Sequence, residues 1–277
     1  MSFEYTTPTI EKWKLDMFMT AVDQFEDDLA EKTHHKIIVG NDYQTILLHI
    51  AGKSILTIRE ILTLCAHGYP DGALSLGRNL YEQMMIIAFF EMHKEDEDFC
   101  KYVQNFFLSS DVQRNKCLRD IEKYIPDDER ENLLIEYYEL KNRANCKLKG
   151  DYWWAQCNSF SDLVSCIMNE QTDEKMKQFL GIQYARYKRA CISLHASCMG
   201  NSNRLGNDTG LEVIDTSPTV YCHSTPLIYA VVSLISIIGF VCSTFELDNA
   251  KYLNPLNELA VFYQREERED ISKKEMK

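Results

Sequence analysis

The segment from Gln183 to Ser197, QYARYKRACISLHAS, contains the side chains best suited to acid–base and phosphate chemistry. Histidine side chains commonly act as acids and bases near neutral pH, so His195 could take a proton from a ribose hydroxyl, while Arg189 could stabilise the negative charge of a phosphate. Three further polar residues of the segment are candidate substrate contacts: Tyr187, Lys188 and Ser193. This set of residues therefore includes a candidate general base or acid and candidate contacts for a phosphate.

Helical geometry separates the two main candidates of this segment. At about 100° per residue, the step from Arg189 to His195 turns one side chain roughly 120° away from the other. The two could act on one substrate only through the long reach of the arginine, a bend in the helix or a dimer interface. The alternative is a basic, solvated helix face with His195 near the end of the helix, where a cation suits the helix dipole.

A second pair of charged residues falls in a segment that is otherwise largely apolar, GRNLYEQMMIIAFF. Arg78 and Glu82 stand one helical turn apart there, and charges in a buried helix are costly unless they are paired. A structural ion pair is one interpretation. The other is an arginine that its own carboxylate holds ready for an anionic ligand.

Metal ligands and stacking surfaces have weaker sequence signals. His34-His35 and Cys222-His223 could supply ligands, but neither pair has a second pair at ligand spacing, so we expect no metal and no cofactor. Trp153 follows two lysines in the stretch NCKLKGDYWWAQCNS and could stack on a nucleic-acid base. The alternative is that the two adjacent tryptophans anchor this loop by packing.

The elements that must position these residues are helices. Apolar residues recur at three- and four-residue steps, whereas alternating β-branched segments between turn residues are hard to find. We therefore predict an all-α protein, a single helical bundle with central buried helices near residues 71–93 and 226–246. Its predicted parts are an N-terminal helical arm over residues 1–40, a bundle domain over residues 41–270 and a disordered tail over residues 271–277.

Composition restricts the location and the partners of the protein. The chain has 42 acidic and 30 basic residues, a net charge of -12, so any contact with RNA must be local. Ten cysteines without a CxxC pair and an N-terminus without a signal-peptide pattern favour the cytoplasm. The segment from Ser224 to Phe245 is uncharged and long enough to span a bilayer, but its hydroxyl side chains and flanking acidic residues favour a buried helix.

Two resemblances follow from these motifs. Arg189 and His195 match the R-x4-6-H spacing of the HEPN superfamily, small helical bundles many of which are metal-independent ribonucleases or nucleotide-handling toxins. The sequence GRNLYEQ, then YWW, then paired tyrosines before SLHAS, resembles the bacterial family called domain of unknown function 5677 over roughly residues 40–200. That family is similar to HEPN-type defence and toxin proteins. The resemblance implies six positions of interest: Arg78, Glu82, Trp153, Tyr187, Ser193 and His195.

The expected function is that of a HEPN-like ribonuclease or nucleotide-processing toxin or antiviral defence effector. Its residues would have these roles: His195 as general base or acid, Arg189 or Arg78 as phosphate stabiliser, Glu82 as orienter of Arg78, and Tyr187 as a substrate contact. RNA or a nucleotide, a second copy in a homodimer or a protein partner are the expected partners, and membrane association is not expected. The alternative is a non-catalytic helical module that binds a small anionic ligand or a protein partner, using the irregular stretch 201–223.

Overall fold

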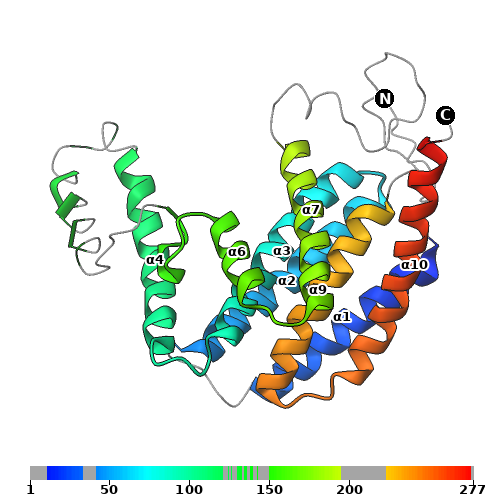
Figure 1. Cartoon of the computed structure of the whole chain (residues 1–277), viewed down its shortest axis with the longest axis horizontal. Helices are drawn as coiled ribbons and strands as arrows, with labels where there is room; N and C mark the ends of the chain where they lie inside the picture. The colour runs from blue at the N-terminus through cyan, green and yellow to red at the C-terminus, as the bar shows by residue number, and fades with distance from the viewer. Residues whose placement is uncertain are drawn as a thin grey trace. The chain divides into compact units, whose positions relative to one another are not determined.

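The computed structural model describes residues 11–33, 42–120, 150–194 and 223–275, with scattered residues between 124 and 142. Every regular element named in these ranges is a helix (Figure 1). The elements are α1 (Lys12–Thr33), α2 (Tyr43–Ala66), α3 (Pro70–Met92), α4 (Phe99–Asp120), the 3-10 helix η2 (Trp153–Ala155), α6 (Phe160–Glu170), α7 (Glu174–Leu194), α9 (Ser224–Phe245) and α10 (Ala250–Glu275). The predicted all-α class is confirmed for the described residues.

The chain divides into two compact units, which are described separately. Unit 1 comprises Met1–Ile38, Leu47–Ile87 and Gln178–Lys277, and unit 2 comprises Val39–Ile46 and Ala88–Lys177. The predicted arm at 1–40, bundle at 41–270 and tail at 271–277 stay predictions. Two findings bear on them: α1 packs against α9 and α10 within unit 1, and α10 continues to Glu275. The charged sequence at the end of α10 is rich in Glu, Lys and Arg, which are good helix formers.

Local sequence signals explain how the turn between α2 and α3 forms. Gly68 follows the end of α2 with a φ of 84°, a left-handed conformation that glycine adopts without steric cost. The amide of Tyr69 donates a 2.9 Å hydrogen bond to the carbonyl of Leu64 and so caps the last turn of α2. Pro70 is the first residue of α3, where a missing N–H costs nothing. Helix α3 therefore begins close to the boundary predicted near residue 71.

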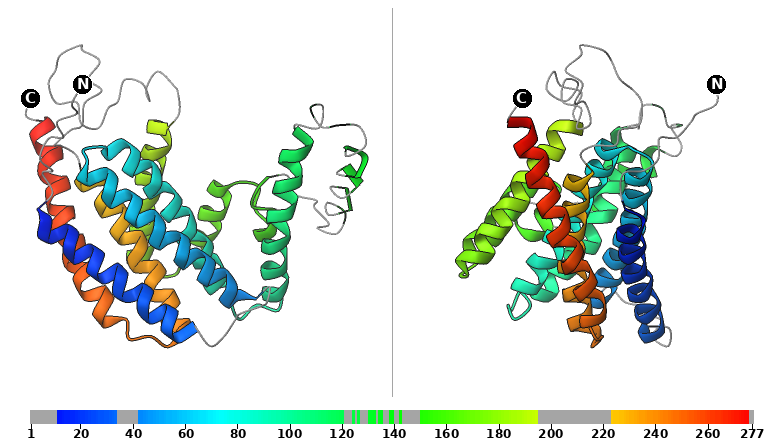
Figure 2. Two further views of the ribbon diagram at one scale, coloured as in Figure 1. Left: turned by 180° about the vertical axis from the view of Figure 1, so that it is seen from behind. Right: turned by 90° about the vertical axis from the view of Figure 1, so that its right-hand side faces the viewer.

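Helix α9 corresponds to the apolar segment predicted near 226–246, and most of its side chains are buried. It packs against α10, and α1 contacts both α10 and α9 (Figure 2). By length and composition α9 could cross a membrane, but 61% of its most apolar window is buried inside the protein. Burial by neighbouring helices is the property expected of the core helix of a bundle.

Ion pairs and aromatic contacts hold the outer helices of unit 1 together. Trp13 of α1 packs edge-on against Phe262 of α10, with ring centroids 5.3 Å apart. Lys14 of α1 is buried and pairs with Glu266 of α10. Glu267 of α10 forms a 2.5 Å ion pair with the guanidinium of Arg186, which lies on α7. Helix α10 is thus joined by charged side chains to both α1 and α7.

The core of unit 2 is aromatic. Trp154 of η2 stacks on Phe90 of α3, with ring centroids 5.2 Å apart and an angle of 16° between the ring planes. Phe106 of α4 meets the same indole edge-on at 4.9 Å, and Phe89 does so at 5.4 Å. Such ring pairs add to the free energy gained from burying apolar surface. They fix η2 between α3 and α4.

Candidate functional site

The best-defined polar cluster of unit 1 is formed by Arg78, Glu82 and Tyr187, which we call the Arg–Glu–Tyr site. Arg78 and Glu82 lie one turn apart on α3, and the guanidinium Nε donates a 3.0 Å hydrogen bond to the carboxylate Oε1 of Glu82. Tyr187 reaches the same carboxylate from α7, and its hydroxyl donates to Oε1 over 2.9 Å. One carboxylate oxygen therefore holds both a cation and a phenol.

The Arg78 side chain also lies against the aromatic ring of Tyr187. The guanidinium carbon is 5.4 Å from the ring centroid, within the range of a cation–π contact. The Arg78 side chain is nevertheless 32% exposed, whereas that of Glu82 is 23% exposed. The guanidinium is therefore oriented by a carboxylate and a ring while part of it faces solvent.

The electrostatics of the site favour hydrogen-bond donation over proton transfer. Burial, and after it the Glu82 carboxylate, raises the pKa of Tyr187 well above its ordinary value. Burial of the Arg78 guanidinium opposes its charge, but the charge of Glu82 and the hydroxyl of Tyr187 outweigh this, so the pKa of Arg78 is also raised. Both groups keep their protons across the physiological range and act as donors.

Two tyrosine rings contact Tyr187, and a third contacts one of these two. The ring of Tyr184 stacks on Tyr187 with centroids 5.9 Å apart, and Tyr81 of α3 approaches it at 5.5 Å. Tyr229 of α9 in turn contacts Tyr81, with ring centroids 5.7 Å apart. This row of rings crosses from α7 through α3 to α9, and it depends on Gly77, where an added Cβ would lie 3.0 Å from the ring of Tyr229.

The hydroxyl of Tyr229 is buried and has no hydrogen-bond partner among the described residues. Burial raises the pKa of this phenol strongly, and the neighbouring groups Tyr81, Tyr187, Cys191 and Glu82 raise it further. The phenol is therefore neutral and within electrostatic range of the Arg–Glu–Tyr site. An unpaired buried hydroxyl is costly in a folded protein.

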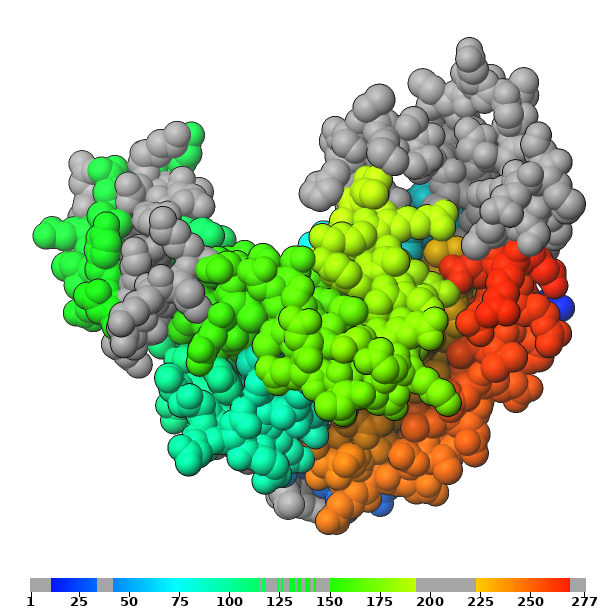
Figure 3. Space-filling model, in the orientation of Figure 1, coloured from blue at the N-terminus to red at the C-terminus, as the bar shows by residue number. Residues whose placement is uncertain are grey.

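The structure brings together some of the predicted site residues and places others elsewhere. Arg78, Glu82 and Tyr187 meet directly. Lys188 is linked to them through Tyr184, because its ammonium lies 5.1 Å from that ring. Arg189 is exposed on the same helix, α7, part of whose surface is seen in Figure 3.

Several predicted residues are outside this description. His195 and the stretch 201–222 lie outside the described residues, as does the side chain of Ser193, so the pairing of Arg189 with His195 stays a prediction. Trp153 is 7% exposed and belongs to unit 2. Its burial agrees with the interpretation that the adjacent tryptophans anchor a loop.

Sequence reasoning missed Tyr81 and Tyr229, and it used Tyr184 only as one of the paired tyrosines of the family resemblance. Tyr184 precedes Tyr187 by one helical turn, and Tyr81 stands beside Glu82, so both could have been found from spacing. The sequence indicates Tyr229 less clearly, because its only distinguishing feature is a phenol within the long apolar helix α9. Its proximity to α3 depends on tertiary packing against Gly77.

Metal-ligating side chains converge in unit 2, at residues that the sequence had not suggested: His93, Cys166 and Glu170. Of the histidine and cysteine pairs considered from the sequence, His34, His35 and Cys222 lie outside the described residues, and His223 is buried before α9. Cys166 and Glu170 lie one turn apart on α6, so their sequence spacing could have indicated that they share a face of this helix. The approach of His93 to them could not be read from the sequence.

Comparison with known proteins identifies a family for the chain. The sequence model of a family of unknown function (DUF5677) matches residues 44–212. No curated protein matches the chain, and no solved structure matches it. The matched region includes Arg78, Glu82 and Tyr187.

Proposed function

The chain belongs to the DUF5677 family of unknown function, and we propose that it acts as a HEPN-like, metal-independent ribonuclease or nucleotide-processing effector. Such a protein would work in the bacterial cytoplasm as a toxin or in antiviral defence. The observation that carries the proposal is the Arg–Glu–Tyr site, in which an oriented and partly exposed guanidinium is ready for a phosphate. The site lies inside the region that defines the family.

In the proposed mechanism the described residues bind and orient the phosphate. Arg78 would stabilise the negative charge that develops on the phosphate oxygens, with Glu82 and the Tyr187 ring holding its guanidinium in place. Lys188 and Arg189 on the exposed side of α7 would contact neighbouring phosphates of the substrate. His195, which follows α7 in sequence, would be the general base or acid. A homodimer would let His195 of one copy serve the site of the other.

The test is cleavage of single-stranded RNA by the purified full chain in excess chelator. His195→Ala should lower the rate by about 10²–10⁴-fold, the usual contribution of a general acid or base. Arg78→Gln should lower it by about 10²–10³-fold, as for a lost transition-state donor. Arg59→Gln is the matched control, because Arg59 on α2 is occupied by Asp23 and Glu26 and should leave the rate unchanged.

Full activity in both His195→Ala and Arg189→Ala would rule out the HEPN assignment. The HEPN assignment would also be ruled out if the wild-type chain in excess chelator cleaved no RNA and altered no nucleotide.

A second candidate function is binding of a small anion or nucleotide without turnover. It is favoured by one observation: Arg78 and Tyr187 both donate hydrogen bonds to Glu82, and their pKa values are raised, so neither group exchanges protons near neutral pH. Calorimetric titration with a nucleoside monophosphate distinguishes the two functions. Binding that Arg78→Gln abolishes, with the nucleotide recovered unchanged, would support this module.

A further inference from the structure

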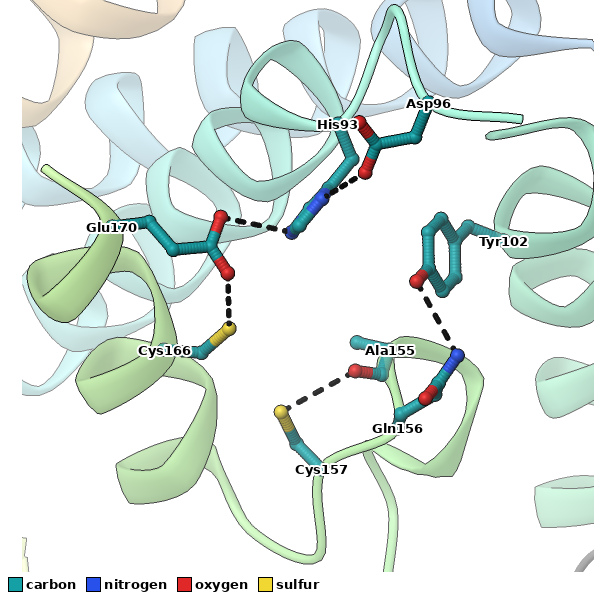
Figure 4. A network of polar contacts seen from close by, with 8 residues as sticks. All are labelled: His93, Asp96, Tyr102, Ala155, Gln156, Cys157, Cys166 and Glu170. Atoms are coloured by element: carbon teal, nitrogen blue, oxygen red, sulfur yellow. Dashed lines mark hydrogen bonds and ion pairs between the residues drawn. The ribbon is translucent and has the colours of Figure 1, made fainter. Parts of the chain in front are cut away.

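A second polar cluster lies entirely within unit 2, where the chain leaving α3 meets α6 (Figure 4). Its ligating atoms belong to His93, Cys166 and Glu170, and one such atom from each residue lies within 4.8 Å of the other two. The imidazole Nε2 of His93 is 3.7 Å from Oε2 of Glu170, and the Cys166 thiol donates a 3.4 Å hydrogen bond to Oε1 of Glu170. Nitrogen, sulfur and oxygen donors therefore surround one point.

These separations suit a tetrahedral ion. Zinc binds nitrogen and carboxylate oxygen at about 2.0–2.2 Å and thiolate sulfur at about 2.3 Å. Neighbouring ligand atoms of a tetrahedron with these bond lengths are about 3.3–3.8 Å apart. The two carboxylate oxygens of Glu170 lie at such distances, Oε2 from His93 Nε2 and Oε1 from Cys166 Sγ. The three ligand atoms lie within 4.8 Å of one another, so they would move closer together around a bound ion.

The imidazole of His93 independently indicates a ligand site. Its Nε2 is buried and has no hydrogen-bond partner within the described part of the chain. Its Nδ1 is 2.7 Å from the carboxylate Oδ2 of Asp96, so Nδ1 carries the proton and Nε2 presents a lone pair to the cluster. A carboxylate behind an imidazole, with the opposite nitrogen directed at the ion, is the usual outer-shell arrangement of a metal-bound histidine.

Local structure holds these side chains in position. Ser159 caps α6 by accepting a 3.2 Å hydrogen bond from the amide of Asp162, and Cys166 and Glu170 follow on one face of that helix. The ring of Phe89 lies 4.4 Å from the His93 ring and that of Tyr102 lies 5.5 Å away. These rings limit the rotation of His93 and shield it from water.

The charges balance when a divalent cation binds. Without a cation, the Cys166 thiol carries the proton that it donates to Oε1 of Glu170. A cation would replace that proton: the S–H bond breaks, the proton leaves to solvent and a metal–sulfur bond forms. One thiolate, one carboxylate and one neutral imidazole then carry two negative charges against the two positive charges of the ion.

We infer that His93, Cys166 and Glu170 form a zinc-binding site, with Asp96 orienting the imidazole and water completing the coordination. The mixed nitrogen, sulfur and oxygen donor set suits zinc better than magnesium or calcium, which prefer oxygen alone. The ion would clamp α6 to the segment after α3 within unit 2. This inference is independent of the proposed ribonuclease, whose assay is run in chelator.

The experiment uses the full chain stripped of metal by dialysis against a chelator. Zinc is then titrated in competition with a chromophoric chelator, and cobalt is titrated separately to report on geometry and sulfur ligation. We expect about one zinc per chain, and a cobalt spectrum with thiolate-to-metal charge transfer and tetrahedral d–d bands. Cys166→Ser should remove the charge-transfer band and weaken zinc binding at least about 100-fold. Asp96→Asn should weaken it about 10–100-fold, as is typical of an outer-shell partner.

The matched control is Cys100→Ser, which changes an exposed cysteine of the same unit and should leave both titrations unchanged. Circular dichroism confirms that each variant retains its helices. If Cys166→Ser fails to fold, mass spectrometry of the wild-type chain replaces it, since zinc should protect Cys166 and not Cys100 from alkylation. Failure of the wild-type chain to bind zinc, equal binding by the Cys166 and Cys100 variants, or alkylation of Cys166 unaffected by zinc would each overturn the inference.

Discussion

The hydroxyl of Tyr187 should contribute measurably to the stability of unit 1, through its hydrogen bond to Glu82. Tyr187→Phe removes the 2.9 Å bond to the carboxylate and leaves the ring contacts in place. Hydrogen bonds to charged groups are worth about 1.5–3 kcal/mol, and the partial exposure of Glu82 lets water replace some of this. We therefore expect a loss of about 1–2 kcal/mol in the free energy of unfolding, or roughly 2–8 °C in Tm.

The assay is urea and thermal unfolding followed by far-ultraviolet circular dichroism, in the wild-type background and in the Glu82→Gln background. A neutral amide accepts a weaker hydrogen bond than a carboxylate, so in the Glu82→Gln background the loss should fall to about 0.5–1 kcal/mol. Tyr69→Phe is the control, since Tyr69 is 39% exposed and its change should cost less than about 0.5 kcal/mol. An equal loss in both backgrounds would refute the bond between Tyr187 and Glu82.

Three other predictions concern packing and pH. Gly77→Ala should destabilise the protein by about 1–3 kcal/mol, because the new methyl would press on the ring of Tyr229; thermal unfolding measures this, and an unchanged Tm would contradict the close approach. Trp154→Ala should cost about 3–5 kcal/mol through loss of the aromatic core of unit 2, seen as a lower urea midpoint; a cost below about 1 kcal/mol would contradict that packing. The free energy of unfolding should fall as pH rises above about 9, because burial raises the pKa of Cys242 to about 11 and that of Cys166 to about 12. These thiols lose their protons at lower pH in the unfolded chain than in the native one. The native state therefore binds more protons in this range, and the slope of unfolding free energy with pH is negative. A flat profile of metal-free protein between about pH 9 and 11, measured by urea unfolding, would contradict this.

The helical architecture could be predicted because it depends on local signals. The three- and four-residue recurrence of apolar side chains and the break at HGYPDG identify α2 and α3 without any knowledge of their neighbours. The uncharged segment at Ser224 to Phe245 likewise predicts one buried helix, and α9 has those bounds. The Glu, Lys and Arg residues near the end of α10 favour the helix that continues to Glu275, while the disordered tail over residues 271–277 stays a prediction.

The candidate sites could be predicted only where their residues share a helix. The ion pair of Arg78 with Glu82 follows from an i,i+4 spacing, and the structure contains it. The sequence analysis names Tyr187 as a substrate contact and does not predict its hydrogen bond to Glu82. That bond joins two helices far apart in sequence, and the packing of α7 on α3 brings it about. His93 and Cys166 illustrate the limit, because His93 follows the end of α3, Cys166 lies on α6, and the distance between them depends on how the whole core packs.

The distribution of tryptophans gives each unit its own optical signal. Trp13 of unit 1 is 43% exposed at the edge of α1, whereas Trp153 and Trp154 of unit 2 are 7% and 2% exposed. Indoles shielded from water emit at shorter wavelengths than indoles in contact with it, so the emission of unit 2 should be blue-shifted. Trp13→Phe then yields a chain whose fluorescence reports on unit 2 alone. With that variant, a ligand that acts on one unit can be told apart from a ligand that acts on the other by light emission, without an added dye.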